Sequence, residues 1–323
     1  MKIKAGIIGG AGYTAGELIR ILTHHPNVYI EFINSTSNAG NSIVNVHSGL
    51  IGETDLCFTD SLPLNTIDVL FLCSAHGDSK KFLDENVVPD HVKIIDLSTD
   101  YRMVRPEHDF VYGLPEMNRE IIRHSEHIAN PGCFATAIQL ALLPLAIKQL
   151  LINEIHVNAI TGSTGAGVKP TETSHFSWRN NNISIYKPFE HQHLNEIRQT
   201  MYQMQPGFSQ LINFIPVRGN FARGIYATIY TKCTLSIEDA KKLYQDFYKN
   251  AAFTFVTDKN PDMKQVVNTN KAVIYLEKHG ENLLIVSMID NLLKGASGQA
   301  VQNMNLMFGL EEKTGLYLKS IGF

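Results

Sequence analysis

The sequence predicts an α/β protein with two domains: a doubly wound parallel sheet first, then an α+β region with an extended mixed sheet. The chain has 323 residues, which at roughly 150 residues per domain corresponds to about two domains. Apolar runs alternate with helical patterns over the first ~130 residues, as in successive βαβ units. Beyond residue 150, segments rich in β-branched and aromatic residues replace this alternation. The change of pattern indicates a second domain of a different type.

The first domain begins with a short apolar strand, residues 3–8, that runs into glycines. A helix is expected over residues 14–24 and a second strand over 28–34. The runs 68–73 and 92–97 are continuously apolar, as expected for strands that are buried on both faces of a parallel sheet. Four strands with helical segments between them are typical of a Rossmann-type domain.

Residues 134–150 are predicted to form a long, mostly buried helix that Pro144 kinks or interrupts. Further helices are expected over 237–250, opened by Ser236, and over 297–310. Strands of the second domain are expected at 154–161, 211–217, 223–233 and 283–290.

The composition limits the possible function classes. With 44% hydrophobic and 18% charged residues, the chain is typical of a folded globular protein. A net charge of -3 provides no overall basic field, so no nucleic-acid partner is expected. No apolar run reaches the ~20 residues of a membrane span, so no membrane association is expected either. The 4 cysteines are scattered without a C-x-x-C pair, which suits a reducing cytoplasm and argues against a disulfide framework or a structural zinc site.

A glycine-rich turn, Gly9-Gly10-Ala11-Gly12-Tyr13-Thr14-Ala15-Gly16, connects the first strand to the first helix. A dinucleotide fingerprint occurs in this context, because glycines let the backbone approach a pyrophosphate and the helix N-terminus supplies N–H groups. The spacing departs from G-x-G-x-x-G, and a tight turn without a ligand is the alternative. We favour dinucleotide binding.

The second strand ends in Asn34-Ser35-Thr36-Ser37, without a carboxylate that could bind the ribose 2′-hydroxyl of NAD. The hydroxyl groups of Ser35 and Thr36 could instead donate hydrogen bonds to a 2′-phosphate. This segment therefore favours NADP over NAD, with ordinary polar loop residues as the alternative.

Cys133 follows an Asn130-Pro131-Gly132 turn at the start of a predicted helix. A helix N-terminus favours the thiolate form of a cysteine, and the thiolate is the form that attacks carbonyl groups. A buried core cysteine is the alternative, and we expect that role for Cys57 and Cys73. Cys133 is the candidate nucleophile.

A nucleophilic cysteine needs an acid/base partner, and the segment His191-Gln192-His193-Leu194-Asn195-Glu196 offers two histidines. If a helix starts here, His193 and Glu196 share a face, so that the carboxylate could orient the imidazole. His191 and His193 could also be metal ligands, but no third ligand follows at an obvious spacing, and no metal is expected. A solvated polar helix start is the remaining alternative.

Four arginines lie beside polar turns and could bind an anionic small substrate: Arg102, Arg119, Arg218 and Arg223. Each of them alone could equally be a surface or ion-pair arginine. The small-residue loop 162–167, which contains Ser163, could bind an anion through its N–H groups or be a tight turn.

These motifs together resemble the N-acetyl-gamma-glutamyl-phosphate reductases, which are related more distantly to the aspartate-semialdehyde dehydrogenases. The resemblance runs nearly end to end, and it is most specific at Pro131-Gly132-Cys133 and Lys294-Gly295-Ala296. The other matching motifs lie at residues 9–14, 75–77, 98–102, 112–116, 191–196, 223–224 and 297–303.

The resemblance implies NADPH-dependent reduction of N-acetyl-gamma-glutamyl phosphate to the semialdehyde and phosphate, through a Cys133 thioester, in arginine biosynthesis. It implies a homo-oligomer, dimer or tetramer, in the cytoplasm. His193 would be the acid/base, with His191 as the other candidate and Glu196 orienting His193. Residues 1–132 and 297–323 would form the dinucleotide-binding domain, and 133–296 the catalytic and oligomerisation domain.

The resemblance also implies which residues contact the two ligands. NADP(H) contacts are expected at Gly9, Gly12, Tyr13, Thr14, Ala15, Ser35, Thr36, Ser74, His76, Gly298, Gln299 and Asn303. Substrate contacts are expected at Arg102, Asn130, Ser163 and Arg223.

The chain departs from the family pattern at several positions. Thr36 stands where an arginine often follows the serine, Val168 where the family has arginine, and Asn195 where it has proline. These departures leave open another N-acyl group, as in N-succinylglutamyl phosphate, or the longer aminoadipyl phosphate, with Arg218 as the candidate partner of an extra carboxylate. A cysteine hydrolase or acyltransferase and a non-enzymatic NADP-sensing protein are the alternative classes.

Overall fold

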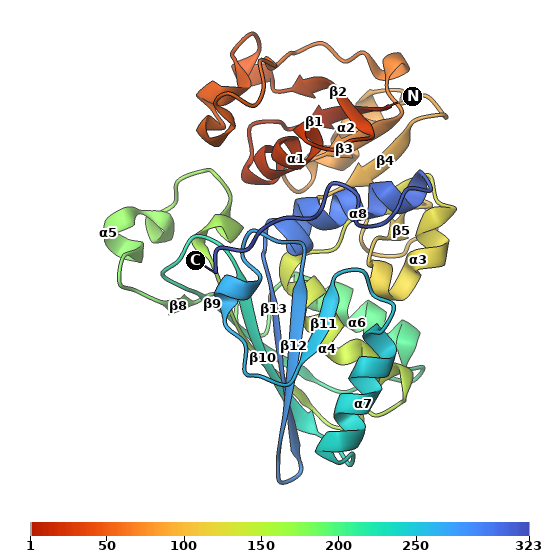
Figure 1. The fold of residues 1–323 in the computed structure, drawn as a ribbon, viewed down its shortest axis with the longest axis vertical. Helices are drawn as coiled ribbons and strands as arrows, with labels where there is room; N and C mark the ends of the chain where they lie inside the picture. Colours follow the sequence, from red (N-terminus) through yellow and green to blue (C-terminus); the bar gives the residue numbers. More distant parts are fainter. Residues whose placement is uncertain (1, 323) are drawn as a thin grey trace. The chain divides into compact units, whose positions relative to one another are not determined.

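The computed structural model describes residues 2–322 and divides into two compact units (Figure 1). The first unit comprises the chain up to Pro131 together with Ala296–Tyr317. The second comprises Gly132–Gly295 together with the segment that begins at Leu318. The sequence places all of 297–323 in the first domain, whereas in the structure the segment after Tyr317 packs with the second unit.

The first unit contains a parallel six-stranded sheet in the order β2-β1-β3-β4-β6-β5. The four expected strands are present as β1 (Ile3–Ile8), β2 (Val28–Asn34), β3 (Val69–Leu72) and β4 (Lys93–Asp96). Two short strands that the sequence does not predict extend the sheet, β5 (Val111–Tyr112) and β6 (His127–Ala129). The strand order changes direction between β1 and β3, and ligands of doubly wound folds bind at the carboxyl ends of the strands at such a point.

The helices of this unit are α1 (Tyr13–Thr23), α2 (Asp78–Glu85), α3 (Pro115–Arg123) and α8 (Gly298–Met307). Although α8 comes from the C-terminal part of the chain, it packs against both α1 and α3. The Ser297 hydroxyl donates to the carbonyl of Thr14 at 2.7 Å, and Arg119 forms an ion pair with Glu312 at 3.1 Å. Arg119 is therefore an ion-pair arginine, the ordinary role that the sequence leaves open.

The second unit contains a mixed seven-stranded sheet in the order β11-β12-β13-β10-β7-β9-β8. The expected strands are β7 (Ile155–Thr161), β9 (Ile212–Arg218), β10 (Ile225–Lys232) and β13 (Asn282–Ile289). The strands that the sequence does not predict are β8 (Ser184–Ile185), β11 (Thr254–Thr257) and β12 (Ala272–His279).

Helices cover one face of this sheet (Figure 1). Helix α4 (Cys133–Ile147) packs on β10 and β13, and α7 (Ile237–Tyr248) packs on β11 and β12. Helix α6 (His193–Met204) packs on α4, and α5 (Phe176–Arg179) is a single turn. Within residues 2–322, no helix has the length and apolar character needed to cross a membrane.

Helix α4 passes through Pro144 without ending there, although the sequence predicts a kink or a break. Proline has no N–H group and cannot donate to the carbonyl four residues earlier, which belongs to Leu140. The hydroxyl of Tyr248 on α7 donates to that carbonyl, and the hydroxyl of Tyr244 donates to the next one, at Ala141. Helix α7 thus supplies the donors that allow α4 to continue to Ile147.

Candidate active site

Cys133 is the first residue of α4, and Gly132 is its N-cap with extended backbone (φ -69°, ψ 150°). The thiol forms no disulfide and is half-buried, whereas the helix is buried from Phe134 to Ala146. A Cβ at Gly295 would lie 2.8 Å from the Cβ of Cys133. This contact explains the glycine of the Lys294-Gly295-Ala296 motif: it makes room for the cysteine.

His193 and Glu196 lie on one face of α6, as the sequence predicts for a helix start. One carboxylate oxygen of Glu196 is 3.9 Å from Nε2 of His193, and the other accepts a hydrogen bond from the amide of Gly132 at 3.0 Å. A Cβ at Gly132 would come within 2.4 Å of the His193 Nε2, so the imidazole occupies the space that the glycine leaves. His193 therefore lies against the residue that precedes Cys133.

His191 has a different role from His193. Its Nδ1 accepts a hydrogen bond from the amide of His193 at 3.2 Å, which leaves the ring proton on Nε2. Burial, reinforced by the charges of Lys187 and Arg218, lowers the pKa of His191 to about 4. The His191 ring is therefore neutral near pH 7 and holds the first turn of α6 in place.

Tyr186 and Arg218 extend this cluster. The guanidinium carbon of Arg218 lies 4.6 Å from the centre of the Tyr186 ring. The Tyr186 ring makes a T-shaped contact with the His191 ring, with the centroids 5.7 Å apart. Burial raises the pKa of Tyr186, the Arg218 charge opposes this rise, and the charge of Cys133 adds to it. The phenol therefore stays protonated beside the nucleophile. The sequence does not single out Tyr186, because a tyrosine in a loop carries no motif.

Arg223 forms an ion pair with the buried Asp290 at 3.1 Å. The Asp290 carboxylate also accepts from the amides of Asn268 at 2.7 Å and Leu292 at 2.8 Å. Arg223 is thus held in place by the carboxylate of Asp290. Arg218, in contrast, has no carboxylate partner within residues 2–322.

The loop 162–167 is a tight turn in the structure. The amide of Ser163 donates to the carbonyl of Phe221 at 2.8 Å, and the amide of Thr164 donates to that of Ala222 at 3.1 Å. These two N–H groups are thus engaged by the backbone, which disfavours the anion-binding alternative. The carbonyl of Ser163 accepts from Arg218 at 3.3 Å.

The glycine turn of the first unit forms a cradle at the end of β1. Gly9 has a φ of +77°, and a Cβ there would lie 2.9 Å from the backbone of Cys73. Gly12 is the N-cap of α1 and offers no side-chain cap, and no acidic residue stands in the first turn of the helix. A Cβ at Gly12 would meet nothing closer than 3.8 Å, so the space above the helix start is open. These features fit the pyrophosphate of a dinucleotide.

The other predicted cofactor residues of this unit differ in exposure. Thr36 is exposed, whereas Ser35 is buried and its hydroxyl accepts from Asn38 at 3.1 Å. Ser74 is half-buried and His76 is exposed, both just before α2. Tyr13 is exposed, Thr14 is half-buried and Ala15 is fully buried. Ala15 could therefore contact the cofactor only through its backbone.

Four predicted contact residues are instead buried within the first unit: Arg102, Asn130, Gln299 and Asn303. Arg102 donates to the carbonyls of Asn130 and Leu97, each at 2.9 Å. The side-chain Nδ2 of Asn130 donates to the carbonyl of Ala296 at 3.0 Å, and its Oδ1 accepts from the side chain of Asn303 at 3.1 Å. The side chains of Arg102 and Asn130 thus hold the turn before Cys133, and Asn130 also holds the start of the segment Ala296–Tyr317. These internal hydrogen bonds disfavour the direct substrate contacts that the resemblance implies for the two residues.

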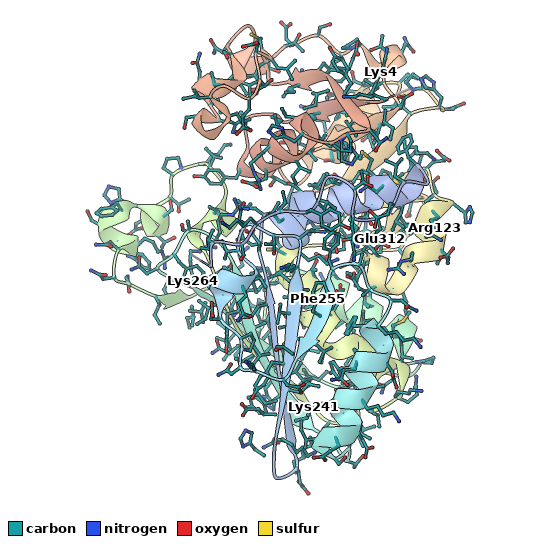
Figure 2. The ribbon with its side chains drawn as sticks, viewed as in Figure 1. Lys4, Arg123, Lys241, Phe255, Lys264 and Glu312 are labelled. Carbon is teal, nitrogen blue, oxygen red and sulfur yellow. The ribbon has the colours of Figure 1, made fainter. Side chains whose placement is uncertain are left out.

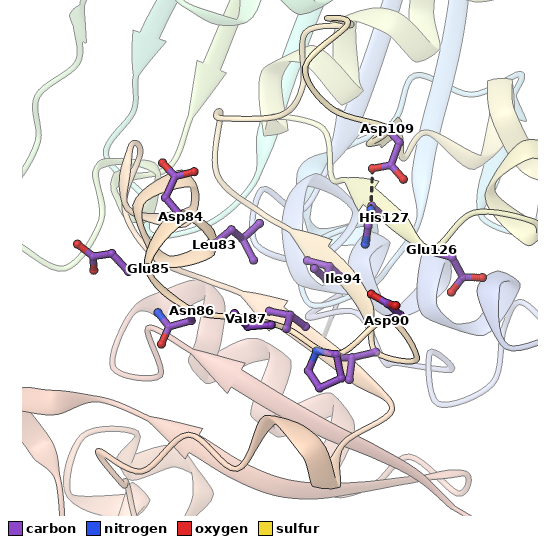
Figure 3. Close-up of a pocket in the computed structure, with 13 residues that line it drawn as sticks. Leu83, Asp84, Glu85, Asn86, Val87, Asp90, Ile94, Asp109, Glu126 and His127 are labelled. Carbon is purple, nitrogen blue, oxygen red and sulfur yellow. Dashed lines mark hydrogen bonds and ion pairs between the residues drawn. The ribbon is translucent and has the colours of Figure 1, made fainter.

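A separate cavity of about 570 Å³ lies in the first unit (Figure 3). Its lining includes five acidic residues and His127, whose Nδ1 is 2.7 Å from the carboxylate of Asp109. None of the predicted site residues line this cavity. Within residues 2–322, no group of three or more His, Cys, Asp or Glu side chains is arranged to hold a metal ion.

Comparison with known proteins places this geometry in a family. A family model described as "Semialdehyde dehydrogenase, NAD binding domain" matches residues 4–125, and one described as "Semialdehyde dehydrogenase, dimerisation domain" matches residues 133–291. A Parabacteroides distasonis protein named N-acetyl-gamma-glutamyl-phosphate reductase is 66% identical, over 99% of this chain and 100% of its own length. The chain belongs to the N-acetyl-gamma-glutamyl-phosphate reductase family. A relative of the same name from Phocaeicola vulgatus is 67% identical, again over 99% of this chain and 100% of its own.

Solved structures agree on the fold of this reductase family member. Aspartate semialdehyde dehydrogenase II of Vibrio cholerae, complexed with ASA, matches with a TM-score of 0.73 at 16% identity, covering 96% of this chain and 99% of its own. Aspartate semialdehyde dehydrogenase of Candida albicans, with NADP, matches with a TM-score of 0.73 at 15% identity, covering 95% and 99%. The predicted family and fold class are therefore confirmed, and the chain is an oxidoreductase. A cysteine hydrolase and a non-enzymatic sensor have no support from these relatives.

Proposed function

We propose that the protein catalyses the NADPH-dependent reduction of N-acetyl-gamma-glutamyl phosphate to N-acetylglutamate semialdehyde and phosphate, a step of arginine biosynthesis. The observation that supports this most directly is the contact of Gly132, the residue before Cys133, with both His193 and Glu196. Its relatives carry the name of this activity over their full length. Its four cysteines form no disulfide, which suits the reducing cytoplasm, where we propose that the enzyme works.

NADP(H) fits the residues of the first unit. We assign the pyrophosphate to the first-turn amides of α1 after Gly12, and the 2′-phosphate to the segment Ser35–Thr36, where no carboxylate would repel it. When bound, the cofactor supplies the hydride that reduces the acyl group. Thr36 has no guanidinium charge, so its hydroxyl offers a weaker grip than an arginine would.

The proposed reaction begins at Cys133. Its thiolate attacks the γ-carbonyl carbon of the acyl phosphate, a C–S bond forms, and the C–O bond to phosphate breaks. The product is an acyl thioester on Cys133 plus inorganic phosphate. The N-terminus of α4, which has no side-chain cap, favours the thiolate and the oxyanion that forms on the carbonyl oxygen.

His193 is proposed to move the proton. It accepts the thiol proton before attack and, as imidazolium, stabilises the oxygen of the thiohemiacetal formed after hydride addition. Collapse of the thiohemiacetal breaks the C–S bond, releases the semialdehyde and restores the Cys133 thiolate. The Glu196 carboxylate, held by the Gly132 amide, favours the charged imidazole.

Arg218 is proposed to bind an anionic group of the substrate, because it lies beside Tyr186 and has no carboxylate partner within residues 2–322. The same observation favours a second candidate substrate with an additional carboxylate, N-succinylglutamyl phosphate, and aminoadipyl phosphate is the longer alternative. Replacing Arg218 with Ala and comparing acetyl and succinyl substrates separates the candidates. Equal losses for both substrates would contradict a contact with an extra acyl carboxylate.

We also propose that the protein forms a homodimer through the sheet face that the helices leave open. Phe255 lies on this face and is 44% exposed (Figure 2). The strand registers place Tyr226 and Tyr230 on the same face, and Tyr230 is 45% exposed. The family model that spans this sheet is described as a dimerisation domain. A second copy of the chain would bury these aromatic rings.

A reverse-direction assay tests the proposed activity. With N-acetylglutamate semialdehyde, phosphate and NADP⁺, the wild-type enzyme is expected to form NADPH only when phosphate is present. Replacing Cys133 with Ala should lower the rate by at least about 10⁴-fold, as expected for the loss of a covalent nucleophile. The prediction of a buried core cysteine is wrong for Cys57, which is exposed in the structure. Replacing Cys57 with Ala is therefore the matched control and should leave the rate unchanged.

A further inference from the structure

His47 lies against the glycine turn, although no motif of the sequence singles it out. It stands between two 3₁₀ turns, Ile43–Asn45 and Ser48–Leu50, in the segment that follows β2. Its Nε2 is 2.7 Å from the carbonyl oxygen of Gly10. Because a carbonyl can only accept a hydrogen bond, the ring proton must be on Nε2.

Gly16 shows how closely the His47 ring fits beneath the turn. A Cβ at Gly16 would lie 2.6 Å from Nδ1 and 2.8 Å from Cε1 of His47. The Phe58 ring also lies beside the imidazole of His47, with the two ring centroids 6.2 Å apart. The last glycine of the turn therefore makes room for an imidazole.

The Gly10 peptide is fixed on both of its polar sides. Its amide donates to the carbonyl of Asn34 at 2.8 Å, and its carbonyl accepts from His47. Gly12, two residues later, is the N-cap of α1. The orientation of the peptide after Gly10 therefore determines where the first amides of α1 point. Those amides are the donors that the NADP(H) pyrophosphate would use.

We propose that His47 is a positioning residue for the dinucleotide pyrophosphate. The hydrogen bond from its Nε2 to Gly10 holds the glycine turn in the conformation that binds phosphate. The inference rests on the proposed binding of NADP(H) at this turn. His47 acts through Gly10, so its loss should weaken the grip on the pyrophosphate and leave the Cys133 chemistry intact.

Two substitutions of His47 test this role on the full chain. Leu removes the donor, whereas Gln keeps an N–H group at about the reach of Nε2. NADPH binding should weaken about five- to tenfold in His47→Leu, the effect of one hydrogen bond, and stay within about twofold in His47→Gln. The KM for NADPH should rise in His47→Leu, while kcat at saturating NADPH stays unchanged. Adenosine 2′-monophosphate, which has no pyrophosphate, should bind both variants like the wild type.

Gly16 provides an independent test. In Gly16→Ala the new Cβ collides with the His47 ring, so NADPH binding should weaken. In a His47→Ala background the same substitution finds room and should cause no further loss. His24→Leu, an exposed histidine at the other end of α1, is the control and should bind NADPH normally.

Each remaining outcome overturns the proposal. Wild-type affinity for NADPH in His47→Leu would show that the hydrogen bond does not set the turn. An equal loss of NADPH and adenosine 2′-monophosphate would show that the substitution disturbs the whole unit. A wild-type chain that binds adenosine 2′-monophosphate but not NADPH, or neither, would overturn the proposed cofactor site together with the role of His47.

Discussion

The two histidines of the His191-Gln192-His193 segment are both buried, and their different partners give them different roles. The ring of His191 is enclosed by Phe134, Tyr186 and Phe214, and only 7% of the residue is exposed. This environment lowers the pKa of His191 to about 4, chiefly by desolvation. The ring stays neutral under the conditions in which His193 is proposed to exchange protons.

The low pKa of His191 predicts a dependence of stability on pH. Because the folded-state pKa lies below the ordinary value of 6.5, the unfolded chain binds more protons between pH 6.5 and 4, and stability falls as the pH is lowered through this window. His191→Asn removes this titration and keeps an acceptor for the His193 amide. Between pH 7.5 and pH 5, the wild type should lose about 2 kcal/mol more unfolding free energy than the variant. Denaturant titrations at the two pH values measure the difference, and parallel losses in both proteins would contradict the assigned burial of His191.

Spacing in the sequence predicts the core of the site. The i,i+3 relation of His193 and Glu196 and the position of Cys133 after a Pro-Gly turn are local features, and the structure has both. Tyr186 and the pairing of Arg223 with Asp290 depend on strands and loops that are distant in the chain. Spacing does not show such contacts. The internal hydrogen bonds of Arg102 and Asn130 could not be predicted from spacing for the same reason.

At the scale of secondary structure, α4 and α7 act as a pair. Pro144 deprives α4 of one backbone hydrogen bond, and the hydroxyl groups of Tyr244 and Tyr248 satisfy the carbonyls near the gap. The sequence predicts where α4 begins and which residues it buries. The continuation of the helix past Pro144 depends on another helix, α7, more than a hundred residues later in the chain.

This pairing predicts that Tyr248→Phe destabilises the second unit. The substitution leaves the carbonyl of Leu140 without its donor inside the protein, a loss of about 1–2 kcal/mol, or a fall of about 2–5 °C in the melting temperature. In a Pro144→Ala background the alanine N–H can donate to Leu140, so the same substitution should cost clearly less. Tyr202→Phe, on an exposed position of α6, is the control. Equal losses in both backgrounds would contradict the compensation between α7 and Pro144.

In the second unit, helices cover one face of the mixed sheet. They leave the other face uncovered, and there Val266 packs on only part of it, against Val286 and Met288. The strands β11 and β12 at its edge were not predicted, so the sequence underestimates the width of the sheet. β12 ends in charged residues beside a turn, and β11 has only four residues. Both features weaken the sequence pattern by which a strand is predicted. Fold class nevertheless follows from sequence, because the alternation of apolar strands and helices in the first unit is strong.

The open sheet face predicts the assembly state. Tyr230 stacks on His156 at a centroid distance of 4.7 Å and remains 45% exposed. Tyr230→Glu would place a charge inside the proposed dimer interface, and the complex should dissociate to the mass of a single chain in light scattering. Tyr202→Glu, on the helical side of the unit, should leave the mass unchanged. A Tyr230→Glu protein that keeps the wild-type mass would contradict an interface on this face.

In the proposed mechanism, Cys133 carries the acyl group between phosphate release and reduction. The most direct measurement mixes enzyme and acyl phosphate without NADPH, and follows both phosphate release and the mass of the cysteine-containing peptides. We expect a burst of phosphate stoichiometric with enzyme, an acyl adduct on the Cys133 peptide, and neither in Cys133→Ala. An adduct on another cysteine, or phosphate-dependent turnover that persists in Cys133→Ala, would contradict this mechanism.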